Sequence, residues 1–191
     1  MIYIDDQIDQ IDIAAVLPRL SEQRREQVLR YRFEQGRRQS AAAYLLLCQG
    51  LLLEHGLSEP PTFCYGEHGK PAIVGHPDIC FNLSHCRSAA ICAVGDRPVG
   101  IDIESIREYR ESLVRYTMNE TEVQQIEQSA RPDVAFIQLW TMKESLLKLS
   151  GDGISNNMKD VLSQASPTIH FTTVVNLQRG YVYSLCEEQP T

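Results

Sequence analysis

Hydrophobic and polar residues alternate over short segments in three parts of the chain, which predicts β-strands there. Glycine and proline residues separate these segments, and the last two enclose a turn that contains Gly180. The predicted strands cover residues 1–5, 79–85, 89–94, 98–104, 168–175 and 181–186.

The first helical region is rich in arginine. Ser21 is a suitable N-cap for a charged helix that reaches about residue 33, and a more apolar helix spans residues 38–55 and ends at Gly56. Between residues 19 and 38 the chain has seven arginines and three glutamates. These arginines either form a solvated helix face or bind an anion.

The second helical region predicts two similar lobes. Asn119 and Glu122 have the spacing of a capping box that opens a short helix, and a longer amphipathic helix covers residues 133–149 and stops at Gly151 and Gly153. The order strand, helices, strands, helices, strands indicates an α+β fold. Because the strand-rich block returns after each helical block, we expect two lobes, each a small antiparallel sheet packed with helices.

Composition argues against several classes of partner. The chain has 191 residues, of which 43% are hydrophobic and 23% charged, so it is expected to fold throughout. Its net charge of −7 argues against a general attraction to nucleic acid or to an anionic membrane, so any anion site has to be local. The longest apolar stretch, residues 41–53, is too short to span a bilayer.

The N-terminus and the cysteines indicate a cytoplasmic protein. Residues 1–10 include Asp5, Asp6 and Asp9 and show no basic or long apolar region of a secretory signal. The six cysteines include no CxxC pair and no spacing typical of zinc ligands. We therefore expect buried free thiols.

Two carboxylates share one face of a predicted strand. Because side chains alternate along a strand, Asp102 and Glu104 point to one side, and Ile101 and Ile103 point to the other. Carboxylates about 6.7 Å apart repel each other by roughly 2.5 kcal/mol at an effective dielectric constant of about 20. A Mg²⁺ ion, which also binds phosphate and water, would relieve this repulsion. The alternative is an exposed strand end whose charges are screened by solvent.

Two other segments add candidate groups. Trp140, Glu144 and Lys148 share one helical face, so Glu144 could complete a metal site and Lys148 could reach a phosphate on it. The alternative is an ordinary surface ion pair. Ser84 and His85 end a predicted strand, where phosphate binding suits them better than nucleophilic catalysis, because adjacent strand residues point apart and the chain has no GxSxG motif. The alternative for His85 is a structural role.

Several of these segments form one ordered set of motifs: Gly69-Lys70-Pro71, Phe81-Asn82-Leu83-Ser84-His85, Gly100-Ile101-Asp102-Ile103-Glu104, and Trp140 to Lys148 followed by Gly151-Asp152-Gly153-Ile154. Together they resemble the 4′-phosphopantetheinyl transferase superfamily, in its surfactin-synthetase-activating (Sfp-type) branch, over roughly residues 20–155. The resemblance implies a pseudo-twofold α+β fold with lobes at residues 1–100 and 101–191 and coenzyme A in the cleft between them. It also implies Mg²⁺-dependent transfer of phosphopantetheine from coenzyme A to a serine of an apo acyl or peptidyl carrier protein, releasing adenosine 3′,5′-bisphosphate.

The same resemblance implies roles for individual residues. Glu122 matches the carboxylate proposed as general base, and Glu144 and Lys148 join it in the catalytic set. The arginine-rich region would face the carrier protein as well as the nucleotide. The implied Mg²⁺ ligands are Asp102, Glu104 and Glu144, and the implied coenzyme A contacts are Arg24, Arg38, Lys70, Ser84, His85 and Lys148.

Two other functions remain as alternatives. A non-catalytic module that binds coenzyme A or a carrier protein would keep the fold without turnover. A Mg²⁺-dependent phosphoesterase would hydrolyse its substrate without a carrier. Because a two-lobed chain supplies its own cleft, we expect a monomer, and the sequence does not indicate which carrier protein is used.

Overall fold

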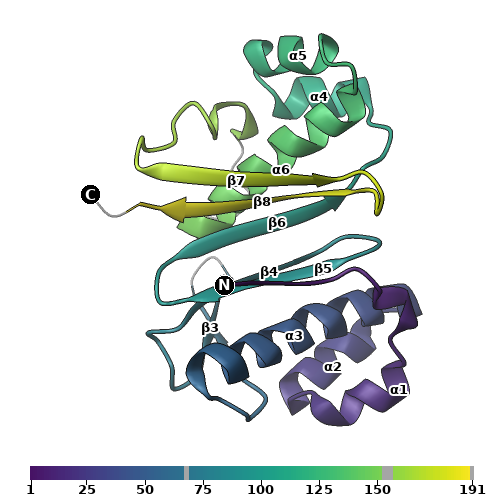
Figure 1. Ribbon diagram of the computed structural model, residues 1–191, viewed down its shortest axis with the longest axis vertical. Helices are drawn as coiled ribbons and strands as arrows, with labels where there is room; N and C mark the ends of the chain where they lie inside the picture. Colours follow the sequence, from purple (N-terminus) through teal and green to yellow (C-terminus); the bar gives the residue numbers. More distant parts are fainter. Residues whose placement is uncertain (67–68, 152–156, 190–191) are drawn as a thin grey trace.

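Two three-stranded antiparallel sheets pack face to face in the middle of the molecule, and one long helix covers the outer face of each (Figure 1). The computed structural model describes residues 1–66, 69–151 and 157–189. This arrangement confirms the predicted α+β fold.

The N-terminal lobe is built around helix α3 (Glu34–His55) and a sheet with the strand order β1-β5-β4. Both strand pairs of this sheet are antiparallel. The remaining elements of the lobe connect these parts. The sheet strands are β1 (Ile2–Asp5), β4 (Cys80–His85) and β5 (Ala90–Gly95), and the connecting elements are α1 (Ile13–Val16), α2 (Glu22–Arg30) and a hairpin of β2 (Phe63–Tyr65) and β3 (Pro71–Ile73).

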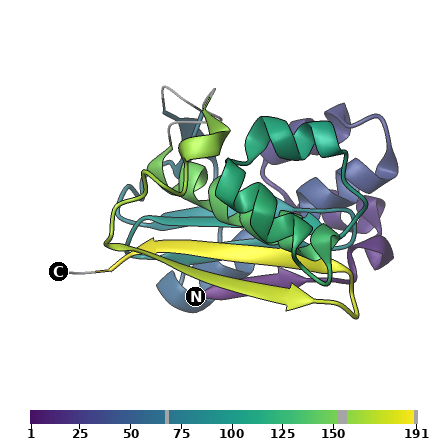
Figure 2. The same cartoon turned by 90° about the horizontal axis from the view of Figure 1, so that it is seen from above.

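The C-terminal lobe is built around helix α6 (Pro132–Ser150) and a sheet with the strand order β6-β8-β7. Its other elements are β6 (Val99–Ser105), α4 (Glu111–Thr117), α5 (Glu120–Glu127), the 3₁₀ turn η3 (Met158–Asp160), β7 (Ile169–Asn176) and β8 (Tyr181–Glu188). Seen from above, the yellow strands β7 and β8 lie along one side, and α4 and α5 lie on the other side of α6 (Figure 2).

Both lobes follow the same chain path. A strand leads to a long helix and then to a hairpin whose second strand pairs with the first strand, as β1-α3-β4-β5 and as β6-α6-β7-β8. The predicted pair of similar lobes is therefore confirmed at the level of topology. The predicted boundary between the lobes, at residue 100, stays a prediction. Strand β6, the first strand of the C-terminal lobe, begins at Val99.

The capping signals in the sequence act as predicted. Ser21 accepts a hydrogen bond from the backbone N–H of Arg24, and Asn119 and Glu122 form both halves of the capping box. Gly56 and Gly151 end their helices with φ angles of 68° and 80°, a left-handed conformation that glycine adopts without strain. Gly153 lies outside the described residues.

Some predicted boundaries are wrong. Helix α2 ends at Arg30 rather than near residue 33, and α3 begins at Glu34 rather than at residue 38. The start of α3 has no side-chain cap, so no sequence signal marks it. Helix α4 and the β2–β3 hairpin were not predicted, because elements of seven and three residues are too short to show a period.

The six cysteines are all free, as predicted, but only three of them are buried: Cys64 is exposed on β2, and Cys48 and Cys80 are half-buried. Burial raises the pKa of the Cys48 thiol to about 11 and that of Cys186 to about 12, so both stay protonated at neutral pH. No helix within the described ranges has both the length and the apolar character needed to cross a membrane.

Side chains of β4 accept hydrogen bonds from backbone N–H groups of β6. The Asn82 Oδ1 atom accepts the N–H of Ile101 at 3.4 Å, and Ser84 Oγ accepts the N–H of Ile103 at 3.3 Å. Both partners advance by two residues in the same direction, so the two strands run parallel at this point. Because Ile101 and Ile103 also fill the apolar core between the sheets, this contact joins the lobes by packing and by hydrogen bonds.

Strand β6 and helix α6 approach each other most closely at Gly100. A β-carbon placed on Gly100 would lie 1.9 Å from the carbonyl oxygen of Ser145 and 2.7 Å from the nitrogen of Leu149. Only glycine permits this backbone contact. The contact sets the distance between β6 and the face of α6 that includes Glu144 and Lys148.

We expect Gly100→Ala to push α6 away from β6 and to lower the free energy of unfolding by about 1–3 kcal/mol, as in other overpacked cores. Chemical denaturation measures this effect. Gly95→Ala is the matched control, because no atom lies within 4 Å of a β-carbon there. Equal stability of the two variants would contradict the close-contact argument.

Candidate active site

A cavity of about 330 Å³ opens where the two lobes meet. Helices α2 and α3, the β2–β3 hairpin and the end of β4 line it from the N-terminal lobe, and α6 lines it from the C-terminal lobe. The structure thus gathers residues that the sequence analysis identified separately. They are Arg24, Ser84, His85 and Lys148.

Arg24 is a buried cation that forms no ion pair with any residue the structure describes. Its guanidinium lies 4.9 Å from the ring centre of Tyr44 and 5.2 Å from that of Phe63. Its Nη1 reaches Ser40 Oγ only at 3.5 Å, and its buried Nε has no hydrogen-bond partner within the described ranges. Burial lowers the pKa of Arg24 below its ordinary value. Aromatic contacts offset only part of the desolvation of a charge, so this side of the cavity suits an anion.

His85 is the last residue of β4 and lines the cavity, and residues of both lobes bond the turn that follows it. Gln39 Nε2 donates to the carbonyl of Cys86 at 2.7 Å, and Ser105 Oγ accepts the N–H of Arg87 at 3.2 Å. Partial desolvation and the nearby charge of Lys148 lower the pKa of His85 below its ordinary value. The imidazole is therefore neutral at physiological pH and can donate a hydrogen bond to an anion.

Lys148 connects the cavity to the acidic strand β6. Its Nζ donates to Asp102 Oδ1 at 2.6 Å, to Ser84 Oγ at 3.0 Å and to the carbonyl of Ile101 at 3.2 Å. The Ser84 hydroxyl itself donates to Asp102 Oδ1 at 2.8 Å. The Lys148 side chain keeps 28% of its surface exposed, so it can also contact a ligand in the cavity.

The carboxylates near Lys148 destabilise one another. Burial, and then the charge of Asp102, raise the pKa of both Glu104 and Glu144. The direction of this shift at Glu104 agrees with the repulsion expected between Asp102 and Glu104. Asp102 Oδ2 and Glu144 Oε1 are buried and have no hydrogen-bond partner in the part of the chain that the structure describes. Lys148 offsets only one of these negative charges, so the remaining charge favours a cation nearby.

No group of three His, Cys, Asp or Glu side chains in the described part of the chain is arranged to hold a metal ion. The predicted three-carboxylate ligand set therefore stays a prediction. Asp102 and Glu144 nevertheless fit Mg²⁺, because each offers an unpartnered buried oxygen and Mg²⁺ usually needs only one or two protein carboxylates beside phosphate and water.

Two of the predicted phosphate contacts are bound to protein groups. Lys70 Nζ donates to the carbonyl of Leu149 at 2.7 Å and so binds the negative end of the α6 dipole from the other lobe. Arg38 lies outside the cavity lining. Its guanidinium bonds Glu34 Oε1 at 2.6 Å and the carbonyl of Asp9 at 2.7 Å.

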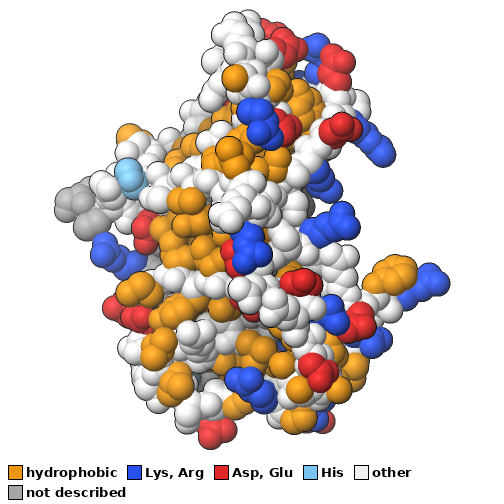
Figure 3. Space-filling view, turned by 45° about the vertical axis from the view of Figure 1, so that its right-hand side comes forward, with side chains coloured by type: hydrophobic (Ala, Val, Ile, Leu, Met, Phe, Trp, Pro, Cys, Tyr) orange, Lys and Arg blue, Asp and Glu red, His pale blue; other side chains and the backbone are white. Residues whose placement is uncertain are grey.

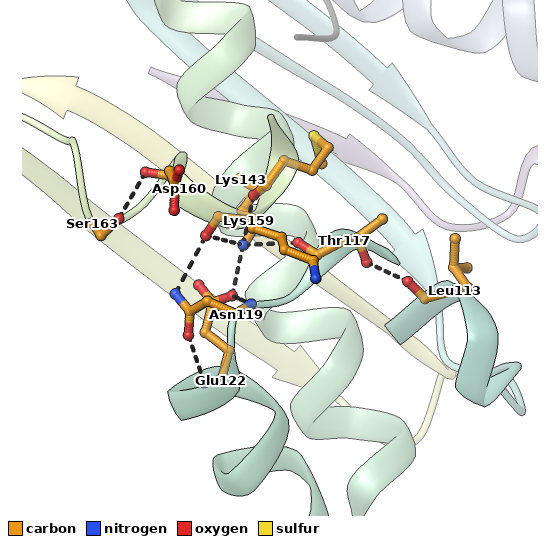
Figure 4. Close-up of polar contacts among 9 residues, drawn as sticks. Leu113, Thr117, Asn119, Glu122, Lys143, Lys159, Asp160 and Ser163 are labelled. Carbon is orange, nitrogen blue, oxygen red and sulfur yellow. Dashed lines mark hydrogen bonds and ion pairs between the residues drawn. The ribbon is translucent and has the colours of Figure 1, made fainter. Parts of the chain in front are cut away.

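Glu122 belongs to a buried network around Lys143 (Figure 4). The Lys143 side chain is 0% exposed, and its Nζ donates to Glu122 Oε2, to the carbonyl of Thr117 and to that of Met158, at 2.7, 3.0 and 2.7 Å. The same Glu122 oxygen accepts the N–H of Asn119 at 2.9 Å. One ammonium group therefore ties α4, α5 and η3 to α6 one residue before Glu144.

Sequence reasoning missed Ser40 and Lys143. Ser40 is a polar residue within the apolar helix α3, and it lies beside Arg24 only because α2 folds back onto α3. Lys143 stands inside the segment from Trp140 to Lys148 that the sequence analysis examined. The available signal was its position four residues after Leu139 and seven after Phe136, in line with the apolar stripe of α6.

We expect Lys143→Met to destabilise the protein by about 3–5 kcal/mol, because it leaves the Glu122 charge buried and unpaired. The double variant Lys143→Met/Glu122→Gln should regain about 1–2 kcal/mol, since an amide can keep the capping bond and needs no counter-charge. Denaturant unfolding of the two single variants and the double variant measures this coupling. Additive effects would show that the ion pair contributes nothing.

Comparisons with known proteins agree with this geometry. Residues 98–188 match the model of the 4′-phosphopantetheinyl transferase superfamily. A 4′-phosphopantetheinyl transferase of Bacillus subtilis is 30% identical over 159 residues, which cover 81% of this chain and 70% of that protein. The transferase psf-1 of Bacillus pumilus is 30% identical over 166 residues, covering 85% of this chain and 71% of the relative.

The 4′-phosphopantetheinyl transferase Sfp of Bacillus subtilis (strain 168) is 28% identical over 157 residues, with 81% of this chain and 70% of Sfp covered. The Sfp-type resemblance seen in the motifs is therefore confirmed over most of the chain. The protein with this two-lobed cavity belongs to the 4′-phosphopantetheinyl transferase superfamily.

Proposed function

We propose that this cavity binds coenzyme A and, together with Mg²⁺, is where its 4′-phosphopantetheine arm is transferred to a serine of an apo acyl or peptidyl carrier protein. The transfer reaction itself follows from the family, which generally uses Mg²⁺. Two features support this cavity as the site of the reaction. Arg24 lies on one side, buried and without an ion-pair partner among the described residues, and the Lys148–Asp102 pair lies on the other.

In this reaction the serine oxygen bonds to the phosphorus of the phosphopantetheine group. The bond from that phosphorus to the bridging oxygen of the pyrophosphate breaks, and adenosine 3′,5′-bisphosphate leaves with the electron pair. The serine proton is released to a base. The chain's task is thus to hold a dense set of negative charges and to orient the serine toward the phosphorus.

Different side chains of the cavity suit different phosphate groups of coenzyme A. Arg24 with Ser40 suits the 3′-phosphate, because the guanidinium is buried, planar and without an anion. Lys148 and the neutral His85 suit the pyrophosphate, since both lie at the end of the cavity that meets β6. We assign Lys70 to the contact between the lobes, and Arg38 to the surface.

Asp102 and Glu144 would hold the Mg²⁺ ion through their unpartnered oxygens, with Glu104 as the predicted third ligand. When bound, the ion supplies positive charge that stabilises the departing bisphosphate. Lys148 keeps Asp102 in place from the opposite oxygen. We assign Glu122 a structural role in place of the general-base role that the resemblance implies, because its carboxylate is buried and bound to Lys143.

The proposal is tested by intact-protein mass spectrometry of a panel of apo acyl and peptidyl carrier proteins incubated with this protein, coenzyme A and Mg²⁺. We expect a gain of one phosphopantetheine group that disappears with chelator. Glu144→Gln should slow the gain by about 100-fold or more, because it removes a charged oxygen from the reaction site.

Other results of the same experiment would overturn the transfer proposal. Binding of coenzyme A without modification of any carrier would favour the non-catalytic module. Breakdown of coenzyme A in the absence of a carrier would favour the phosphoesterase. Full activity of Glu144→Gln would show that the Glu144 carboxylate is not needed as a metal ligand.

A second prediction concerns Arg24. Arg24→Met should weaken binding of coenzyme A by about 10–100-fold, the usual effect of losing a charged hydrogen bond, and should leave binding of dephospho-coenzyme A unchanged. Isothermal titration of both ligands measures this ratio. Arg38→Met is the matched control and should not change it. An equal loss for both ligands would show that Arg24 does not recognise the 3′-phosphate.

A further inference from the structure

An exposed aromatic and cationic segment borders the candidate active site. Residues 29–35 are all exposed, and Phe33 and Tyr31 keep 70% and 37% of their surface accessible. We call residues 30–33, which are Arg30, Tyr31, Arg32 and Phe33, the α2–α3 lip. Aromatic and arginine side chains are the residue types in which protein interfaces are enriched.

The lip is held in a defined conformation. The ring of Tyr31 packs against Gly36, where a β-carbon would lie 2.6 Å from the Tyr31 Cδ1 atom. Arg37 Nε donates to the carbonyl of Tyr31 at 2.9 Å. The guanidinium of Arg32 lies 5.4 Å from the ring centre of Phe33. Because the lip is already ordered, a partner that binds it loses little conformational entropy.

The lip is also positively charged within an acidic chain. Residues 19–38 hold seven arginines and three glutamates, a net charge of +4, whereas the whole chain has −7. Arg30 and Arg38 have carboxylate partners, and none of the other five arginines forms an ion pair with a described residue. Lys and Arg side chains gather along the right-hand edge of the space-filling view, where a hydrophobic side chain also projects (Figure 3).

The lip lies next to the place where transfer is proposed. Tyr31 lines the cavity together with His85 and Lys148. Gln35, just after the lip, donates from Nε2 to the carbonyl of Arg87 at 3.3 Å, in the turn that follows His85. A protein whose serine reaches the cavity therefore passes close to the lip.

We propose that the α2–α3 lip is a docking surface for the carrier protein, and that it fits a partner surface with acidic side chains around an apolar patch. This inference rests on the proposed function. Phe33 would provide the apolar anchor, since aromatic and arginine side chains dominate the energy of protein interfaces. Arg30 and Arg32 would attract the acidic partner and orient it.

The test measures binding of fluorescently labelled apo carrier proteins, the same panel as above, by anisotropy, which does not depend on transfer. Phe33→Ala and Arg32→Glu should each weaken carrier binding by about fivefold or more, while the affinity for coenzyme A stays within about twofold of wild type. The loss in Arg32→Glu should shrink at high salt, because the attraction is electrostatic.

The controls are matched in chemistry and distant in place. Leu53→Ala removes a side chain that is 63% exposed on the same helix α3, roughly 28 Å further along its axis. Arg97→Glu reverses an exposed charge in the turn between β5 and β6, at the opposite end of these strands from His85. Neither should change carrier binding.

The outcomes separate the two proposals. Carrier binding that is lost in the lip variants supports the docking surface, even if mass spectrometry finds no transfer and the proposed reaction fails. Lip variants that bind carriers like wild type, or a wild-type protein that binds none of the panel, overturn it. A dimer of the protein alone that Phe33→Ala dissociates in sedimentation experiments would also overturn it, because the lip would then bind a second copy.

Discussion

The hydroxyl group of Ser84 joins the two lobes at the point where the candidate site lies. It donates to Asp102 and accepts from the N–H of Ile103 and from Lys148, so its one donor and two acceptor positions are all used. Three elements, β4, β6 and α6, meet at this oxygen. The position of Asp102 relative to Lys148 therefore depends on the contact between the lobes, and the site cannot form in one lobe alone.

The buried charges of the protein fall into two classes that the surroundings distinguish. Lys143 has a carboxylate and backbone carbonyls as partners, so its charge is satisfied and its role is structural. Arg24 Nε, Asp102 Oδ2 and Glu144 Oε1 lack hydrogen-bond partners among the described residues. Arg24 lines the cavity, and the two carboxylates lie near Lys148, which lines it from the other lobe. A buried group without a partner costs free energy in the empty protein, and a ligand of opposite charge recovers that energy on binding.

The same topology occurs in both lobes, but the two lobes contribute different chemistry. The N-terminal lobe supplies Arg24 and the aromatic rings of the proposed nucleotide side, from α2, the segment before α3 and the β2–β3 hairpin. The C-terminal lobe supplies the carboxylates on β6 and α6, held together by the backbone contact at Gly100. A substrate with several negative charges that also needs a metal ion bridges these two halves, so the cleft suits a nucleotide with a pyrophosphate.

Local sequence determined the elements whose signals are short-range: the strands around Asp102 and Ser84, the caps at Ser21 and Asn119, and the glycine ends of α3 and α6. It also identified the repulsion at Asp102 and Glu104, because alternation along one strand is sufficient to place both carboxylates on one face. Only the tertiary structure decided the partners. Lys70 bonds the end of α6 and Glu122 bonds Lys143, while Arg24 forms no ion pair with a described residue. These contacts join residues that are far apart in the chain and that packing brings together. The spacing of residues along a sequence therefore does not indicate which of several charged groups will remain unpaired.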